Sequence, residues 1–181
     1  MAARIIIISG ACGTGKTTIS KILAEKSECN LAVHIHTDDY YQYIRKGYMH
    51  PWMDGTGKQN KIVISAVAAS AEEFAINGYE VFVDGTIGPW FLEPWLKIAE
   101  SGIDVRYIIL RPDEQTTVRR AMNRKQREEF PLNFEKIQNI WKSFLDLDKY
   151  EENVIDTTDQ TVDETVVFVK KHLQKDDFPL V

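Results

Sequence analysis

The sequence has only two cysteines in 181 residues, Cys12 and Cys29, which argues against a disulfide framework and makes a reducing cytoplasm the expected location. It also lacks an apolar run long enough to cross a bilayer, since Ile5–Ile8 has the length of a strand. The strand predicted from Arg4 leaves no room before it for a signal peptide. A secreted, disulfide-based or membrane-spanning protein is therefore not expected.

An excess of basic charge is also missing, because 22 Lys and Arg residues face 27 Asp and Glu residues, for a formal net charge of −5. General nucleic-acid binders and membrane-surface binders carry the opposite balance, so neither kind of partner is expected. No internal repeat or low-complexity segment is present. With 44% hydrophobic and 27% charged residues, the composition is typical of a globular protein, and we expect one domain over residues 1–181.

A glycine-rich stretch follows Ile5–Ile8 and opens into a helical pattern. The stretch consists of Gly10, Ala11, Cys12, Gly13, Thr14, Gly15, Lys16, Thr17 and Thr18. Its glycines let successive N–H groups surround a polyphosphate, and the following helix directs its positive dipole end at the same anion. Lys16 adds charge near the β- and γ-phosphates, and the Thr17 hydroxyl is placed to bind Mg²⁺. The stretch predicts a phosphate-binding loop, the alternative being an ordinary tight turn.

Short β-branched runs alternate with longer amphipathic stretches. The predicted strands are Arg4–Ser9, Ala32–His36, Glu80–Asp84, Val105–Leu110 and Asn153–Asp156. The predicted helices are Lys16–Ser27, Lys61–Asn77, Phe91–Ser101, Asp113–Arg127, Phe134–Leu147 and Val162–Gln174. This alternation predicts an α/β fold with a parallel sheet covered by helices on both faces. The irregular segments Asp38–Asn60 and Lys125–Asn133 interrupt it, and we expect both at the carboxyl edge of the sheet, where ligands bind.

Carboxylates follow the second and third strands. A carboxylate after the second strand can accept the proton of a substrate hydroxyl as it attacks the γ-phosphate of ATP. We expect Asp38 to be this base and Asp39 to cap the next helix, although capping would account for either residue. Asp84, before Gly85, has the setting of an acid that holds Mg²⁺ directly or through water. The alternative for Asp84 is a turn-forming Asp-Gly pair.

A basic helix face leads into the second irregular segment. Arg120, Arg124 and Arg127 are spaced i, i+4, i+7 and so share one face. Guanidinium groups on a closing segment can reach a transferring phosphoryl group and stack on a base. The alternative is a solvated face paired with neighbouring acidic residues.

Aromatic side chains gather in two places beside this edge. The first group is Tyr40, Tyr41, Tyr43, Tyr48 and Trp52, and the second is Trp90, Phe91 and Trp95. Either group can belong to the core. Their position in irregular segments favours a pocket wall for a flat or partly apolar acceptor. We therefore assign to the substrate site Tyr41, Trp52 and Trp90, together with Asp38 and Asp39. His34 and His36 share a sheet face without a third ligand at suitable spacing, so we do not predict a metal pair.

Taken together, these residues resemble the small P-loop kinases of the nucleoside-monophosphate-kinase-like group, in the branch of gluconate kinase, shikimate kinase, chloramphenicol phosphotransferase and the polynucleotide kinase domain. The resemblance spans nearly the whole chain. It implies a three-layer α/β/α fold with a five-stranded parallel sheet in the order 2-3-1-4-5 and a small lid at about 125–133. It also implies that Asp38 is the general base, that Arg120, Arg124 and Arg127 are lid arginines, and that a turn including Thr157 holds the adenine.

The departures from these families concern the acceptor, which we expect to bind within residues 38–60. Asp84-Gly85 is not followed by the arginine that grips an acceptor phosphate, and Tyr41 stands where polynucleotide kinases have an arginine. A neutral or aromatic hydroxyl is therefore favoured over a phosphorylated acceptor. The sequence predicts a phosphotransferase that uses ATP and Mg²⁺ on a small molecule such as a sugar acid, a nucleoside or an antibiotic-like compound, as a monomer or homodimer.

The alternative is a regulatory P-loop protein that binds or hydrolyses nucleotide without an acceptor. A GTPase is not favoured, because Asn60-Lys61-Ile62-Val63 fails the guanine-reading pattern Asn-Lys-x-Asp.

Overall fold

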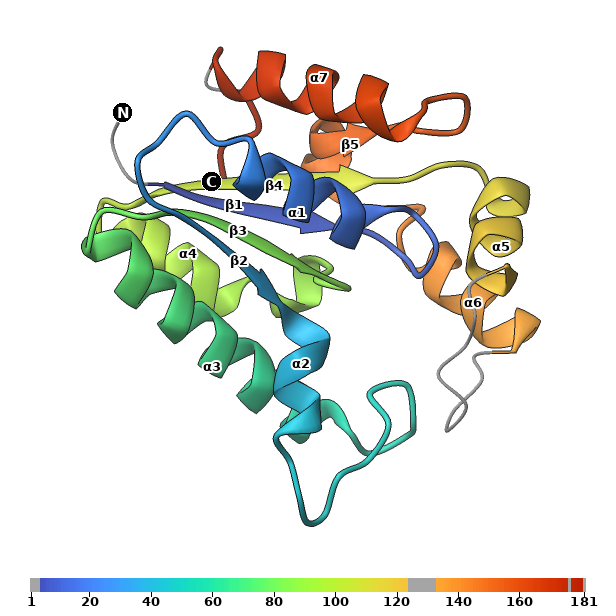
Figure 1. Ribbon diagram of the computed structural model, residues 1–181. Coiled ribbons are helices and arrows are strands. Elements are labelled where there is room, and N and C mark those ends of the chain that lie inside the picture. The colour runs from blue at the N-terminus through green and yellow to red at the C-terminus, as the bar shows by residue number, and fades with distance from the viewer. Residues whose placement is uncertain (1–3, 124–132, 176, 181) are drawn as a thin grey trace.

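A parallel sheet forms the centre of the molecule in the computed structural model, which describes residues 4–123, 133–175 and 177–180. Its strands are β1 (Arg4–Ser9), β2 (Ala32–His36), β3 (Glu80–Gly85), β4 (Asp104–Leu110) and β5 (Val154–Ile155). All are parallel and lie in the order β2-β3-β1-β4-β5 (Figure 1). The predicted fold class and strand order are confirmed.

Helices cover both faces of this sheet. They are α1 (Lys16–Glu25), α2 (Thr37–Gln42), α3 (Gly57–Ile76), α4 (Glu93–Glu100), α5 (Glu114–Met122), α6 (Phe134–Lys142) and α7 (Val162–Leu173), with short 3₁₀ turns η1 (Pro89–Phe91) and η2 (Asp148–Asn153). Figure 1 shows α1 and α7 on one face and α3 and α4 on the other. The helices α5 and α6 lie beyond the ends of the strands. No helix in the described ranges is long and apolar enough to span a bilayer.

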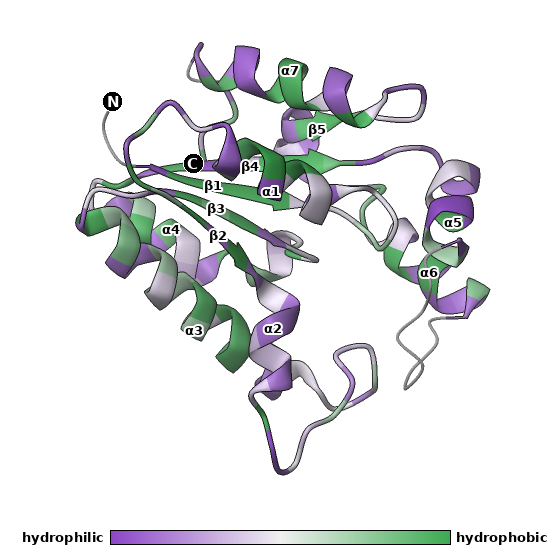
Figure 2. Cartoon of the chain, in the orientation of Figure 1, coloured by the Kyte–Doolittle hydropathy of each residue, from purple (hydrophilic) through white to green (hydrophobic). Residues whose placement is uncertain are grey.

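The central strand β1 is apolar on both sides because helices cover it on both sides. Ile5 and Ile7 are buried in a cluster with residues of α3 and α4, whereas Ile6 and Ile8 are buried with residues of α1 and α7. Figure 2 shows the strands of the sheet largely in the hydrophobic colour, between helices that mix hydrophobic and hydrophilic residues. The alternation fixes the register of β1 and thereby the position of the loop that follows it.

The segment predicted as irregular from Asp38 to Asn60 contains more helix than its sequence indicates. The chain passes from β2 directly into α2, and α3 already begins at Gly57. The six residues of α2 are too few to display a helical period of apolar residues. At the start of α3, Asn60 Nδ2 donates to the Pro51 carbonyl over 2.8 Å, which fixes the preceding turn.

Several other predicted elements are shorter in the structure, among them β5 and α5. The strand predicted over Asn153–Asp156 is reduced to β5, because Asn153 is the last residue of η2. The helix α5 ends at Met122, after Asp113 has capped its start by accepting a hydrogen bond from the Thr116 amide over 2.6 Å. Positions 124–132, which include Arg124, Arg127 and most of the predicted lid, lie outside the described residues.

A bidentate ion pair joins Arg111, which follows β4, to Glu151 in η2. The Arg111 guanidinium donates to both carboxylate oxygens of Glu151, over 2.9 and 2.8 Å. The Leu147 amide donates to the same carboxylate over 3.1 Å. The pKa of Glu151 is below its ordinary value of 4.5, and the hydrogen bonds from Arg111 are the largest cause.

Replacing Glu151 by glutamine is therefore expected to lower the free energy of unfolding near neutral pH by about 1 kcal/mol, a value reduced for partial exposure. The lowered pKa means that the charged form stabilises the fold above the ordinary pKa of 4.5, and that this contribution is lost as the pH falls through the folded-state pKa. Urea unfolding of both proteins at neutral and acidic pH measures this. An equal difference at both pH values would contradict the assignment.

Candidate active site

The loop between β1 and α1 has the backbone that the glycine pattern predicts. Gly10, Gly13 and Gly15 have φ angles of 143°, 91° and 91°. At Gly13, an added Cβ would lie 2.5 Å from the Thr117 carbonyl and 2.9 Å from the Ala121 side chain. Glycine is thus needed both for the left-handed conformation and for the close approach of the loop to α5.

Lys16 folds back across this loop. It is the first residue of α1, it is 6% exposed, and its ammonium group donates to the Ala11 carbonyl over 3.1 Å. The Thr14 hydroxyl donates to the same carbonyl over 3.0 Å. The N-cap residue of α1 is Gly15, which has no side chain to cap the helix, so the first amide groups of α1 can bind an anion. The arrangement can hold a phosphate chain against both a fixed charge and a helix N-terminus.

The carboxylate of Asp84 is the centre of the polar contacts beside the loop. Asp84 lies opposite Ile8 of β1 on one side and His36 of β2 on the other, and its side chain is fully buried. The Thr17 hydroxyl donates to its Oδ2 over 2.6 Å. His34 Nε2 lies 2.6 Å from Oδ1, and His36 Nδ1 lies 3.0 Å from Oδ2. Asp84 thus connects the phosphate loop to β2.

These contacts set the charge of the buried carboxylate. Burial alone would raise the pKa of Asp84, but the hydrogen bonds from His34, His36 and Thr17 together lower it below its ordinary value. The pKa of His36 is raised above its ordinary value of 6.5, and the largest cause is the hydrogen bond to Asp84, which outweighs the opposite effect of burial. The nearby carboxylates of Asp38 and Asp39 add to the increase. These contacts favour the ionised form of Asp84 and shift His36 toward its protonated form, relative to the isolated side chains.

The sequence did not predict the role of the two histidines. Their spacing indicates a shared sheet face, and the structure places both on Asp84. The signal was present in the strand register, because β2 and β3 are adjacent in the predicted order and His36 lies directly opposite Asp84. A carboxylate partner on a neighbouring strand satisfies the histidines.

Asp38 lies in the first turn of α2, at the predicted edge of the sheet. Its side chain is 70% exposed, and its Oδ2 lies 3.5 Å from His36 Nε2. The prediction that Asp39 caps this helix is wrong, because the N-cap residue is His36 and no side chain makes a capping hydrogen bond. Asp39 Oδ1 instead accepts a hydrogen bond from Gln42 Nε2 over 3.4 Å. Asp38 is thus open to a ligand while it contacts the Asp84 cluster.

Two tyrosines near Asp38 lie in residues 38–60, the segment predicted to bind the acceptor and called the acceptor segment below. The Tyr41 hydroxyl donates to Asn60 Oδ1 over 3.2 Å, and the Tyr48 hydroxyl lies 3.2 Å from His50 Nδ1. Burial, with a smaller effect of the Asp38 charge, raises the pKa of both tyrosines. Both hydroxyls therefore stay protonated at neutral pH, as possible donors and acceptors for a polar ligand.

The acceptor segment also reaches α6. The Trp52 ring stacks on His50 with 4.9 Å between ring centres, and the Lys136 ammonium group of α6 lies 5.8 Å from the Trp52 ring centre. A cation over an aromatic face is an attractive contact. The segment after α2 and the helix after the predicted lid therefore meet at Trp52.

The second aromatic group divides between the surface and the core. Trp90 is 48% exposed and makes edge contacts with Phe91 and Phe144. Trp95 is fully buried in the core, so it is not a pocket wall. Its placement on α4, facing the sheet, separates it from Trp90 on the preceding turn.

Arg120 contacts the turn predicted to hold the adenine. Its guanidinium group donates to the carbonyls of Thr157, Thr158 and Gln160 over 3.3 to 3.5 Å. Thr157 is 2% exposed, and its hydroxyl is buried without a hydrogen-bond partner among the described residues. The structure thus brings together Arg120 and Thr157. Arg124 is outside the described part of the chain.

The residues beside the loop fit a magnesium ion carried by a nucleotide. The Thr17 hydroxyl and the Asp84 carboxylate are oxygen ligands of the kind that Mg²⁺ prefers, and they lie within 2.6 Å of each other. Within residues 4–123, 133–175 and 177–180, no group of three or more His, Cys, Asp or Glu could hold a metal. Mg²⁺ keeps several waters and substrate phosphates as ligands, so the two oxygens of Thr17 and Asp84 suffice for an ion carried by a nucleotide.

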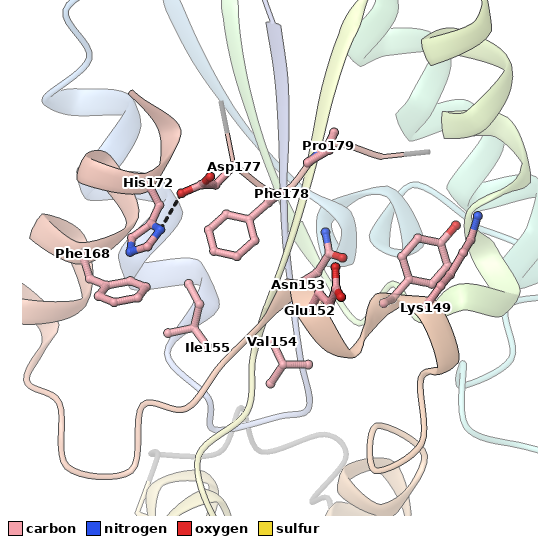
Figure 3. A pocket seen from close by; sticks show the side chains of 11 residues that line it. Lys149, Glu152, Asn153, Val154, Ile155, Phe168, His172, Asp177, Phe178 and Pro179 are labelled. Carbon is pink, nitrogen blue, oxygen red and sulfur yellow. Dashed lines mark hydrogen bonds and ion pairs between the residues drawn. The ribbon is translucent and has the colours of Figure 1, made fainter. Parts of the chain in front are cut away.

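A cavity of about 680 Å³ lies elsewhere, between β5, α7 and the C-terminal segment (Figure 3). Phe168 and Phe178 line it together with His172, whose Nδ1 lies 2.7 Å from Asp177 Oδ2. No residue of the phosphate loop, β2 or β3 contributes to its wall. The cavity is therefore separate from the candidate active site.

Comparisons with known proteins agree with this geometry. The sequence matches the AAA domain family over residues 6–140. A cytidylate kinase of Archaeoglobus fulgidus is 28% identical over 153 residues, which cover 80% of this chain and 79% of the relative.

Solved structures share the fold at low sequence identity. A sugar kinase from Janibacter sp. has a TM-score of 0.70 at 16% identity and covers 95% of both chains. A gluconokinase from Sinorhizobium meliloti has a TM-score of 0.65 at 17% identity and covers 96% of this chain and 97% of its own. Since the family match spans more than half of the sequence, the chain belongs to the AAA domain family and carries a kinase-like P-loop domain.

Proposed function

We propose that this protein transfers the γ-phosphate of ATP to a hydroxyl group of a small molecule. One observation carries the proposal: contacts run without a break from the phosphate loop to an exposed carboxylate. Thr17 bonds Asp84, Asp84 bonds His36, and His36 faces Asp38. A nucleotide held by the loop would thus have a candidate base within the same cluster of side chains.

The nucleotide site supports binding of ATP with Mg²⁺. The glycine-rich backbone (residues 10–18) and the Lys16 ammonium group would hold the β- and γ-phosphates. Thr17 and Asp84 would hold Mg²⁺, which neutralises the charge that develops on the phosphate oxygens. Arg120 and the turn at Thr157 would bind the base, with Arg124 as a second lid arginine.

The transfer step then needs a base for the acceptor. As the acceptor oxygen attacks the γ-phosphorus, the bond from phosphorus to the β–γ bridging oxygen breaks and ADP leaves. The hydroxyl proton moves to the Asp38 carboxylate, which is exposed and can approach a ligand directly. The products are ADP and a phosphorylated acceptor, and the proton later passes to solvent.

The surroundings of Asp38 favour a neutral acceptor with a flat or partly apolar part. Tyr41 and Asp39 lie on the same helix α2 as Asp38 and supply an aromatic ring and a second carboxylate. We assign Trp52 and Trp90 to the acceptor site as further aromatic surface. Sugar acids, nucleosides and antibiotic-like alcohols have suitable hydroxyls. A phosphorylated acceptor, such as the name cytidylate kinase implies for the Archaeoglobus relative, is less favoured because Gly85 is not followed by an arginine. We place the reaction in the cytoplasm, in a monomer or homodimer without nucleic acid as partner.

The test is a panel of hydroxyl-bearing metabolites and antibiotics, with ADP release measured for each compound in the presence of ATP and Mg²⁺. The proposal expects at least one compound to raise ADP release well above the rate with water alone. ATP hydrolysis at one unchanged rate across a broad panel would instead favour a regulatory nucleotide-binding protein.

Replacing Asp84 by asparagine is expected to raise the Mg²⁺ concentration for half-maximal turnover by roughly ten- to hundredfold, because the charge that holds the ion and its waters is lost. The measurement is a Mg²⁺ titration at saturating ATP. Glu151→Gln is the matched control. Glu151 lies in η2 and its carboxylate bonds Arg111, so its loss should leave the Mg²⁺ requirement unchanged. An unchanged Mg²⁺ requirement in Asp84→Asn would remove Asp84 from the metal site.

A further inference from the structure

The two ring nitrogens of His36 face two different carboxylates. Nδ1 lies 3.0 Å from Asp84 Oδ2, and Nε2 lies 3.5 Å from Asp38 Oδ2. The side chain is 24% exposed, so it lies between a fully buried carboxylate and one that is largely in solvent. One ring nitrogen of His36 is therefore directed at each carboxylate.

His36 is also the only hydrogen-bond or ion-pair partner of the Asp38 carboxylate within residues 4–123, 133–175 and 177–180. An exposed carboxylate on a short helix samples several rotamers, and a general base must stay within reach of one hydroxyl. A single contact to a side chain that is itself anchored in the sheet restricts those rotamers. The anchor is Asp84, held in turn by His34 and Thr17.

We propose that His36 is a positioning residue that holds Asp38 in the orientation needed to take the acceptor proton. This inference rests on the proposed function, because it concerns the base of that reaction. His36 transfers no group itself. It connects the orientation of Asp38 to Asp84 and, through Asp84, to Thr17 of the phosphate loop, so that one connected set of side chains positions both the base and the nucleotide.

His34 serves as the comparison residue, because it contacts Asp84 without contacting Asp38 in the described part of the chain. Its Nε2 bonds the other oxygen of Asp84. A residue that acted only through Asp84 would behave like His34. A residue that positions Asp38 has an effect that depends on Asp38.

Two substitutions of His36 separate its two contacts. In His36→Asn, the amide nitrogen takes the place of Nδ1, so the bond to Asp84 can persist while the contact with Asp38 is lost. In His36→Gln, the amide nitrogen takes the place of Nε2, so the contact with Asp38 can persist while the bond to Asp84 is lost. We expect His36→Asn to lower kcat for the acceptor by about ten- to hundredfold, since misplacement of a reacting group has effects of this size.

The expected pattern has three parts. The ATP dissociation constant stays the same in His36→Asn, and His36→Gln recovers a substantial part of kcat. In the Asp38→Asn background, His36→Asn causes no further loss, whereas His34→Ala has the same effect as in the wild type because it acts through Asp84. Thermal unfolding of each variant, followed by circular dichroism, verifies that the fold is intact.

Two results would overturn the inference and leave the proposed function in place. One is that His36→Gln loses more kcat than His36→Asn and also needs more Mg²⁺. That result would mean that His36 acts only through its bond to Asp84. The other is an undiminished effect of His36→Asn in the Asp38→Asn background. If Asp38→Asn itself leaves acceptor phosphorylation at the wild-type level, the proposed base is wrong, and the inference falls with it.

Discussion

Acceptor phosphorylation is expected to fall by about a hundred- to ten-thousandfold when Asp38 is replaced by asparagine, because an amide cannot take the hydroxyl proton. The affinity for ATP should stay near the wild-type value, since Asp38 lies on α2 and has no contact with the loop of residues 10–18. Steady-state kinetics with the acceptor and isothermal titration with ATP measure the two quantities separately. A loss confined to kcat would identify Asp38 as the base.

Asp39→Asn is the matched comparison, because Asp39 is the next residue of the same helix turn and bonds only Gln42 among the described residues. We expect a smaller loss of kcat than in Asp38→Asn. A larger loss in Asp39→Asn would move the role of the base to Asp39.

Replacing Lys16 by alanine is expected to weaken ATP binding by roughly ten- to hundredfold, the effect of losing a charge-assisted hydrogen bond to phosphate. The Lys16 ammonium group is already held over the loop by the Ala11 carbonyl, so little ordering is needed when the nucleotide arrives. Isothermal titration with ATP in the presence of Mg²⁺ gives the affinity.

Lys21→Ala provides the control for charge. Lys21 lies on the same helix α1, its side chain is 66% exposed, and its nearest acidic partner is Glu25 at 4.0 Å. It should bind ATP like the wild type. Equal weakening in both variants would mean that Lys16 acts through the overall charge of α1 and has no direct contact with phosphate.

Much of the fold could be predicted because local patterns and packing agree. The apolar run of β1 requires helices on both faces, and the alternation of strands and helices indicates a parallel sheet. The strand order itself came from the resemblance to P-loop kinases, and the structure confirms it. The loop glycines were predictable from their pattern between a strand and a helix, and the structure adds that Gly13 lies too close to α5 for any side chain.

The rest of the site depends on contacts between segments that are distant in sequence. The residues next to His34 and His36 in the sequence do not indicate Asp84, which lies about fifty residues away. The predicted strand order places β2 beside β3, but the register that brings the histidines to Asp84 comes from the structure. Arg120 was predicted from its helix face, but its bonds to carbonyls after β5 depend on how α5 packs. Trp90 and Trp95 have similar sequence surroundings, and only the packing of α4 separates the exposed ring from the buried one.

The most direct test of the proposed function is the fate of the γ-phosphate. The protein would be incubated with Mg²⁺, an acceptor from the panel and ATP labelled in the γ-phosphate, and the products separated and identified by mass spectrometry. The phosphotransferase account predicts label bound to a hydroxyl oxygen of the acceptor, in an amount equal to the ADP formed. Label found only in inorganic phosphate, with every acceptor recovered unchanged, would contradict it.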